Sequence, residues 1–319
     1  LGPAPGLGGW RRDWLRRAFA RALGGALERL GWRQPVLWFF NARAGFVLGP
    51  PAARAFPGGV GPAVYHAVDD LRQVAGADAE EIERAEAFLA ARAARVIASA
   101  PPLFERLRRL APDRALHWPN VADFERFHRA ADPAAEIPRA ITALPRPRIV
   151  FAGHLTPSKL DVPLLDRAIE RRPLWQWIFI GPVWEGADSE AIRRWARFPN
   201  VRLMGAVPYD QLPEWLAGAD ALIIPYRRDS SAESVCPLKF FEYLATGKPI
   251  AATRLPALEP FGGVVPLSEG AEDFLQSLER ALAGGAERRR EQRLALGRRH
   301  SWLNRMREVE KLLAELESP

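Results

Sequence analysis

Lys239 and Glu242 are the two charged residues whose types and spacing best fit a binding site. Pro237 suits the first position of a helix and Gly247 the left-handed residue that ends one, which predicts a helix over residues 237–245. Residues three apart share a helix face, so the ammonium and the carboxylate would be neighbours. A cation and free N–H groups at a helix start favour phosphate, and a carboxylate one turn later can accept hydrogen bonds from a ribose diol. The pattern predicts a site for a nucleotide diphosphate; a solvent-exposed ion pair is the alternative.

The elements that would position this helix are strands and helices in alternation. Residues 250–253, just after the helix, are apolar and typical of a buried strand. Further strands are predicted at residues 36–40, 63–68, 95–99, 115–118, 148–152, 177–180 and 221–225. Helices are predicted between strands, among them residues 78–94, 101–110 and 212–217. This βαβα order indicates an α/β chain with parallel sheets.

Composition narrows the class of protein. With 319 residues, 48% of them apolar, the chain can fill two domain cores, and no apolar run approaches the length of a bilayer span. A single cysteine, Cys236, excludes an internal disulfide, and five scattered histidines lack metal-ligand spacing, so no metal is expected. The net charge of +7 suggests an acidic donor, anionic lipid or nucleic acid as partner. Because most arginines alternate with acidic residues, we expect a solvated surface and no nucleic-acid partner. A cytoplasmic protein is expected because neither a signal peptide nor a membrane-spanning run is recognised.

Residues 10–30 form a second charged feature. Their apolar residues recur at helical spacing and their arginines crowd another side, which predicts a basic amphipathic helix. One interpretation is peripheral contact with an anionic membrane, to which each basic residue near the surface adds about 1 kcal/mol. The other is a helix that flanks a sheet. The apolar positions are Trp10, Trp14, Ala18, Leu23, Leu27 and Leu30.

Residues 237–250 also carry the motif P-L-K-x-x-E-Y-L-A-x-G-K-P-[IV]. It is closely similar to the donor-site motif of group 1 glycosyltransferases of the GT-B fold, and most similar to bacterial cell-surface polysaccharide transferases of the teichuronic-acid type. The resemblance implies two Rossmann-like domains facing a cleft. These are an acceptor-side domain over residues 1–140, a donor-binding domain over 141–300 and a carboxy-terminal helix over 301–319 that crosses back. The first domain is expected to be truncated, because the strand, Gly-rich loop and βα unit that normally open it do not precede Val36.

The resemblance assigns nucleotide contacts to residues at strand ends. In the family, the residue after a glycine such as Gly153 and a basic residue a few positions on contact the pyrophosphate, which points to His154 and Lys159. Residues 199–209 resemble a segment whose turn holds the base, and Tyr209 would stack on that base or close off a helix start. The residues implied to bind the nucleotide are Gly153, His154, Lys159, Gly181, Tyr209, Ser234, Val235, Cys236, Lys239 and Glu242.

Catalytic carboxylates are implied in both halves of the chain. The family's first acidic position, eight residues before Glu242, contacts the donor sugar and falls on Ser234 here. The adjacent Glu233 is therefore the candidate, and the retaining or inverting outcome stays open. Asp69 and Asp70 follow a predicted strand, in a Tyr-x-x-x-Asp-Asp pattern that resembles the same transferases. We expect one of the pair to cap the following helix and the other to deprotonate an acceptor hydroxyl.

The leading interpretation is a metal-independent glycosyltransferase of the hexosyltransferase type. It would move a sugar from a UDP- or GDP-linked donor, without another cofactor, to a glycan or lipid-linked acceptor. The process would be cell-surface polysaccharide synthesis at the inner face of the membrane. One alternative is a nucleotide-sugar epimerase of the same fold, which would act on the donor without an acceptor. Another is a basic membrane-associated binding protein with a vestigial donor site.

Overall fold

The chain forms two compact units, each with its own parallel sheet. The computed structural model describes residues 9–49, 56, 59–74, 76–184, 186, 189–285 and 289–317, without the side chains of residues 9–12, 230, 231, 284 and 285. The first unit comprises residues 1–118 and 315–319, and the second comprises residues 119–314. The α/β class predicted from the alternation of strands and helices is confirmed.

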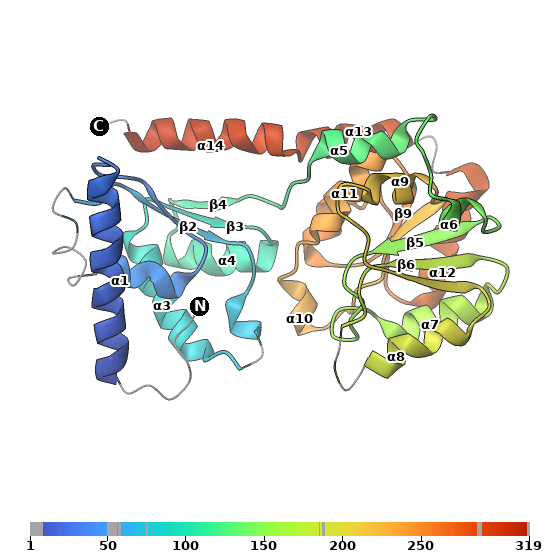
Figure 1. Cartoon of the computed structure of the whole chain (residues 1–319), viewed down its shortest axis with the longest axis horizontal. Helices are drawn as coiled ribbons and strands as arrows, with labels where there is room; N and C mark the ends of the chain where they lie inside the picture. Colours follow the sequence, from blue (N-terminus) through green and yellow to red (C-terminus); the bar gives the residue numbers. More distant parts are fainter. Residues whose placement is uncertain are drawn as a thin grey trace. The chain divides into compact units, whose positions relative to one another are not determined.

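The first unit is built on a four-stranded parallel sheet in the order β1-β2-β3-β4 (Figure 1). Its elements are α1 (Gly9–Arg29), β1 (Leu37–Phe39), the 3₁₀ helix η1 (Ala42–Leu48), β2 (Ala63–Ala67), the 3₁₀ turn η2 (Leu71–Gln73), α3 (Ala79–Arg92), β3 (Arg95–Ala98), α4 (Pro101–Leu110) and β4 (Ala115–His117). Neighbouring strands pair in register, for example Tyr65 with Val96. The central strands β2 and β3 are largely buried, so the core of this unit lies around them.

Helices α3 and α4 form where the sequence carries local signals for a helix. The Asp78 carboxylate caps α3 by accepting a hydrogen bond from the Glu81 N–H at 2.9 Å. Pro101 begins α4 at a position where no N–H is needed. The apolar side chains of both helices, such as Ile82 and Leu103, are buried. Both predicted helices are confirmed.

Helix α1 is present as predicted, but only part of its predicted apolar face is buried. Ala20, Gly24 and Leu27 are buried, whereas Trp14 and Leu30 are 60% and 61% exposed. Small side chains at Ala20 and Gly24 let α1 pack closely, and the bulky apolar side chains are left in solvent. Within the described part of the chain, neither α1 nor any other helix combines the length and the apolar composition that crossing a membrane requires.

The second unit contains a six-stranded parallel sheet in the order β10-β9-β8-β5-β6-β7. Its helices are α5 (Phe124–His128), η3 (Arg129–Ala131), α6 (Arg139–Thr142), α7 (Val162–Arg171), α8 (Glu190–Arg193), η5 (Arg194–Arg197), α9 (Leu212–Ala217), α10 (Ser230–Glu233), α11 (Leu238–Thr246), η6 (Pro256–Phe261), α12 (Ala271–Arg280), the π-helical turn Ala281–Gly285, α13 (Arg290–Arg299) and α14 (Trp302–Glu317). Its strands are β5 (Arg148–Ala152), β6 (Gln176–Ile180), β7 (Val201–Gly205), β8 (Ala221–Ile224), β9 (Ile250–Thr253) and β10 (Leu267–Ser268). Helix α14 starts in this unit, and its last residues group with the first unit.

The strand order of the second sheet reverses at β5. The chain runs outward from β5 through β6 and β7, and then returns to the other side of β5 for β8, β9 and β10. Accordingly, Val150 of β5 pairs with Ile178 of β6 and with Leu222 of β8. Ligands of open parallel sheets bind outside the carboxyl ends of the strands at such a reversal. The ends of β5 and β8 are therefore the expected location of a binding site.

Helix α11 lies where the motif predicts it, starting and ending one residue later than expected. Pro237 is its N-cap, and Gly247 ends it in the left-handed conformation with φ of 68°. Phe240, Phe241 and Leu244 are fully buried, so the predicted inward face is confirmed. The helix packs against α5, α9 and α13 (Figure 1).

The division between the units falls after Trp118, whereas the domain boundary was expected near residue 140. The reason is that α5 packs on α11 and therefore belongs to the second unit. The short helix α6 follows and buries Ile141. The roles of the two units as acceptor-side and donor-binding domains stay predictions.

Candidate functional site

The floor of the candidate site, at the reversal in strand order, is made of backbone. β5 and β6 are each followed by a glycine with positive φ, 141° at Gly153 and 138° at Gly181. A Cβ on Gly181 would lie 2.1 Å from the carbonyl oxygen of Gly153, and one on Gly153 would lie 2.9 Å from Cε of Lys239. Only glycine allows both this conformation and these approaches. The main chain at the carboxyl ends of β5 and β6 is therefore closely packed, against itself at Gly181 and against Lys239 at Gly153.

Lys239 brings a positive charge to this floor. It lies in the first turn of α11, and its ammonium donates a hydrogen bond to the hydroxyl of Tyr226, two residues after β8. Its Nζ lies 5.0 Å from the ring centroid of Phe151 in β5 and 4.9 Å from that of Tyr226. The structure thus holds this cation at the ends of β5 and β8. Its role in binding a diphosphate stays a prediction.

Two tyrosines that were not among the predicted site residues support the lysine and its helix. Tyr226 is 7% exposed and accepts the hydrogen bond from Lys239. The hydroxyl of Tyr243 accepts a hydrogen bond from the N–H of Ala152 at 2.8 Å, which ties α11 to the end of β5. Tyr226 closely follows a predicted strand at the same edge as Gly153, which was its one sequence signal. Tyr243 is a position of the motif, but its bond to Ala152 could not be predicted because the two residues are 91 positions apart.

Glu242 is the buried acid of the site. It is 6% exposed, and its Oε1 accepts a hydrogen bond from the Tyr209 hydroxyl at 2.7 Å. Burial raises the pKa of Glu242, while the hydrogen bond from Tyr209 and the charge of Lys239 act in the opposite direction. Two carboxylate oxygens offer about four acceptor positions. Acceptor positions for a diol therefore remain on the Glu242 carboxylate after it has accepted the hydrogen bond from Tyr209.

Tyr209 is 51% exposed and makes contacts that the sequence did not reveal, while its expected stacking on a base stays a prediction. Its ring packs edge-on against Phe127, with centroids 5.5 Å apart, and the Arg126 guanidinium lies 5.4 Å from its centroid. Its hydroxyl is directed at Glu242, and its pKa is raised, first by burial and then by the Glu242 charge. The side chain that was expected to stack on a base or close off a helix start is bonded to the predicted ribose-binding carboxylate.

His154 and Lys159, the other two expected pyrophosphate contacts, lie in the exposed loop after β5. The ring of His154 lies 6.2 Å from that of Trp184 in the loop after β6. These two loops are joined by backbone hydrogen bonds, such as Leu155 N–H to the Pro182 carbonyl at 2.9 Å. His154 thus adjoins the glycine floor, and both ligand contacts stay predictions.

The expected phosphate-binding segment before α11 is mostly buried. Ser234 and Cys236 are buried and Val235 is partly exposed, and the Cys236 carbonyl accepts a hydrogen bond from Nδ2 of Asn120 at 2.6 Å. Glu233, at the end of α10, is exposed instead. It lines a separate pocket of about 220 Å³ whose wall also includes Arg228, Asp229, Arg254 and Glu259. Neither Lys239 nor Glu242 is among the residues that line this pocket.

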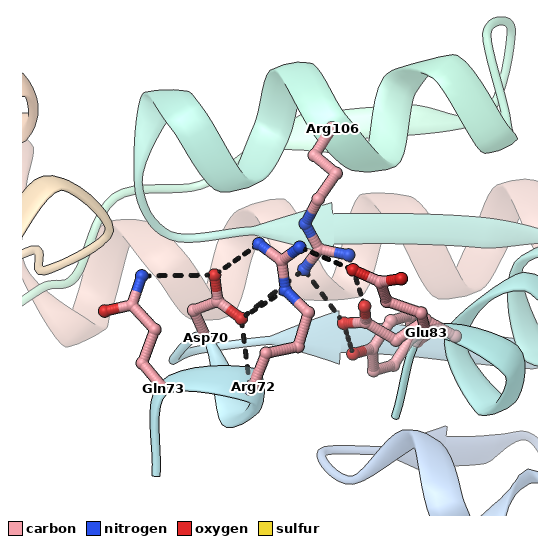
Figure 2. A network of polar contacts seen from close by, with 7 residues as sticks. Asp70, Arg72, Gln73, Glu83 and Arg106 are labelled. Atoms are coloured by element: carbon pink, nitrogen blue, oxygen red, sulfur yellow. Dashed lines mark hydrogen bonds and ion pairs between the residues drawn. The ribbon is translucent and has the colours of Figure 1, made fainter. Parts of the chain in front are cut away.

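In the first unit, Asp70 and Asp69 have different surroundings. Asp70 is buried and caps η2, and it accepts hydrogen bonds from Nε and Nη2 of Arg72 at 2.9 and 2.6 Å (Figure 2). Burial alone would raise the pKa of Asp70, but the bonds and charges of Arg72 and Arg106 outweigh it and lower that pKa. Asp69 is exposed. Asp70 thus acts as the expected cap, and the catalytic role left for Asp69 stays a prediction.

Asp70 belongs to a buried polar network that the sequence did not reveal. Arg72 also bonds Glu83 at 2.9 Å, and Arg106 of α4 lies 3.9 Å from Asp70 (Figure 2). Arg106 pairs with Glu86 of α3, whose side chain is completely buried and also accepts a hydrogen bond from Tyr65. The network fixes the loop that carries Asp69.

Two further features bear on alternative sites. A pocket of about 550 Å³ lies at the amino end of β9, lined by Pro249, Ile250 and Arg280 among others. Ligands of open parallel sheets bind at the carboxyl ends of the strands, so this pocket is not the expected nucleotide site.

Among the residues that the structure describes, no group of three or more His, Cys, Asp or Glu side chains is arranged to hold a metal ion. Metal independence stays a prediction.

Known proteins resemble the chain in both sequence and fold. Residues 146–284 match the model of a family described as glycosyl transferases group 1. TuaH of Bacillus subtilis strain 168, named as a candidate teichuronic acid biosynthesis glycosyltransferase, is 31% identical over 168 residues, which is 50% of this chain and 41% of TuaH. The match thus spans about two fifths of the length of this curated relative.

Two solved structures match over nearly the whole chain. HepE of Anabaena, in complex with UDP and glucose, has a TM-score of 0.73 and 15% identity, and the match covers 98% of this chain and 84% of HepE. The catalytic domain of starch synthase IV from Arabidopsis thaliana, bound to ADP and acarbose, has a TM-score of 0.68 and 14% identity, with coverages of 94% and 76%. At this level of identity the likeness concerns the fold alone. Residues 146–284 are therefore similar to the group 1 glycosyltransferases, and the chain has the GT-B fold of the solved glycosyltransferase structures.

Proposed function

We propose that this chain is a metal-independent glycosyltransferase of the hexosyltransferase type that uses a nucleotide-diphosphate sugar as donor. Its acceptor would be a glycan or a lipid-linked glycan in cell-surface polysaccharide synthesis. The observation that carries the proposal is the placement of Lys239 and Glu242 on α11 beside the glycine floor. This placement lies inside the family-matched segment, at the reversal in strand order.

Each part of the site has a role in this reaction. Lys239, which packs on the backbone of Gly153, would bind the diphosphate and stabilise the charge that develops on it as the sugar leaves. Glu242 would accept hydrogen bonds from the ribose diol. Structures of HepE hold UDP with glucose, which supports UDP over GDP as the nucleotide of the donor.

The catalytic proposal rests on two exposed carboxylates. Asp69 would remove the proton of the acceptor hydroxyl, because Asp70 is already engaged by Arg72 and Arg106. Glu233 would contact the donor sugar, as the resemblance implies.

Calorimetric titration with UDP, GDP and their sugar conjugates tests the donor site. We expect one nucleotide family to bind, and Lys239→Ala or Glu242→Ala to weaken binding at least tenfold, about 1.4 kcal/mol. The physical reason is that each change removes a charge-assisted contact to the ligand. If the folded chain binds no nucleotide, the proposal is wrong.

Asp69→Asn and Glu233→Gln serve as matched controls in the same experiment. Neither should change the affinity for UDP, since neither residue is proposed to hold the nucleotide. Each should slow sugar transfer by about a hundredfold or more, the usual contribution of such a group. Transfer at the full rate by both variants would remove the catalytic assignments and leave the binding site in place.

We also propose that α1 contacts an anionic membrane surface, at the inner face of the cell membrane. Trp14 and Phe19 are 60% and 55% exposed on this helix, and the arginines Arg17 and Arg21 are exposed beside them. Exposed aromatic and basic side chains on one helix suit the interface between water and anionic lipid.

A further inference from the structure

Glu242 and Tyr209 form a pair whose geometry implies a specific task. The carboxylate is almost completely buried, and one of its oxygens accepts a hydrogen bond from the phenol at 2.7 Å. A buried carboxylate without a partner is unfavourable as an anion. Only an ionised carboxylate is a pure acceptor for both hydroxyls of a diol. The neighbours of Glu242 therefore decide whether it can bind ribose.

The phenol of Tyr209 is itself held in place. Its ring contacts Phe127 on one side and the Arg126 guanidinium on another, and Arg126 is bonded to the Asp123 carboxylate at 3.0 Å. These contacts come from α5 and its cap, so the orientation of the tyrosine does not depend on a bound ligand. Because its ring is packed on two sides, we expect Tyr209 to hold the carboxylate of Glu242 in one position.

We infer that Tyr209 is a positioning residue for the ribose-binding carboxylate: its hydroxyl orients Glu242 and keeps it ionised, and it stays bonded to Glu242 while the nucleotide binds. The inference rests on the proposed function, since it assumes that Glu242 meets a ribose. It assigns Tyr209 a task other than base stacking. It also makes α5 a part of the nucleotide site through Phe127 and Arg126.

The inference predicts a pH dependence with a defined sign. Burial raises the pKa of Glu242, and the Tyr209 hydroxyl lowers it, so its loss would raise that pKa further. Binding needs the ionised form and is lost as the pH falls through this pKa. Tyr209→Phe should therefore weaken UDP binding about tenfold at pH 7 and move the acid limb of the affinity profile to higher pH. Most of the loss should be recovered at high pH.

Other charged groups near α11 must be considered in such a profile. Lys239 lies on the helix itself, and the neighbouring elements α5, η3, α9 and α13 contribute the rest. These groups are Asp123, Glu125, Arg126, His128, Arg129, Glu214, Arg290, Glu291, Arg293, Arg298 and Arg299, with His300 after α13. Because the wild-type chain and Tyr209→Phe share all of them, the difference between the two profiles reports on Glu242.

The chain offers a matched control. The hydroxyl of Tyr65 donates to the buried Glu86 at 2.8 Å in the first unit, the same kind of bond as that between Tyr209 and Glu242. Tyr65→Phe should reduce stability and leave the affinity for UDP and its pH profile unchanged. Calorimetric titration of the full chain with UDP between pH 5.5 and about 9 would compare the wild-type chain with both variants.

Each other outcome has a distinct meaning. If Tyr209→Phe keeps the wild-type affinity and profile, or binds UDP more tightly, the positioning role is wrong, because the hydroxyl then has no effect or obstructs the ligand. If affinity falls equally at every pH, the hydroxyl does not keep Glu242 ionised, and the inference also fails. If the wild-type chain binds no UDP, the proposed function fails first, and the comparison between variants is not needed.

Discussion

Single residues at the ends of β5 and β6 determine how closely the main chain packs beside the proposed nucleotide site. Gly181 lies so close to the Gly153 carbonyl that any side chain there would collide with backbone. Backbone cannot move aside as the end of a flexible side chain can. The tolerance of this floor to substitution is therefore low.

Gly181→Ala is expected to lower the free energy of unfolding by about 2–4 kcal/mol, from backbone strain and overpacking together, and to weaken UDP binding. Urea denaturation followed by tryptophan fluorescence would measure the first effect, and titration with UDP the second.

Gly205→Ala separates the two causes. Gly205 has φ of 71° at the same edge of the sheet, and a Cβ there would meet no atom within 4 Å. Gly205→Ala should lower the free energy of unfolding only by the strain of the left-handed conformation, about 1–2 kcal/mol. Equal losses in the two glycine variants would show that the contact with Gly153 is not a real constraint.

Residue-level prediction succeeds where the signal is local. Lys239 and Glu242 were identifiable because both lie within one turn of a helix whose ends are marked by Pro237 and Gly247. The Tyr209 bond to Glu242 joins residues 33 positions apart. Its existence depends on how α5 fixes the ring, which no pattern in the chain describes.

Helices and strands were predictable for a related physical reason. β9 and α4 have the predicted bounds because an apolar run or a proline marks each of them. The buried face of α1 was only partly predictable, because the small residues Ala20 and Gly24 lie on it beside Leu27. The burial of Glu86 on α3 was also missed, because an acidic residue on a helix is normally exposed to solvent. Here Tyr65 and Arg106, which are distant in sequence, pair with it.

Helix α4 provides a test of how one element is anchored. Arg106→Ala should lower the free energy of unfolding by about 3 kcal/mol, because it leaves the carboxylate of Glu86 buried without its cationic partner. Urea denaturation monitored by circular dichroism would measure this loss.

Arg108→Ala on the same helix is the matched control. Arg108 pairs with Glu105, and both side chains are about half exposed, 52% and 50%. Such a pair contributes about 0–1 kcal/mol. A loss for Arg106→Ala no larger than that for Arg108→Ala would show that the buried network does not stabilise the first unit.

At the scale of the whole molecule, the net charge of +7 and the exposed side chains of α1 both favour binding to an anionic membrane. The double variant Arg17→Ala/Arg21→Ala should bind vesicles of anionic lipid about 30-fold more weakly, at about 1 kcal/mol for each arginine. Vesicle sedimentation at two salt concentrations would measure the affinity, which should fall as salt rises.

Arg193→Ala/Arg197→Ala removes the same charge from an exposed part of the second unit. If this variant loses as much vesicle affinity as the α1 variant, the attraction is a general effect of net charge. The assignment of the membrane contact to α1 would then be withdrawn.

The two units were predictable to different degrees. The family match covers residues 146–284, entirely within the second unit, where motif and strand ends coincide. In the first unit the strands follow from apolar runs, but the polar network around Asp70 follows from pairings between elements far apart in sequence. Local sequence propensity predicts the strands of both sheets, whereas the polar contacts that were missed join residues far apart in the sequence.

The glycine floor has a consequence for redesign of donor preference. Gly153 and Gly181 carry no side chain, and their N–H groups are bonded to the carbonyls of Ile180 and Gly205, so the floor has no side chain that could distinguish one donor from another. Mutagenesis libraries aimed at a new sugar or base should therefore leave the floor unchanged and vary the rim, where Trp184 and His154 carry side chains that are largely exposed.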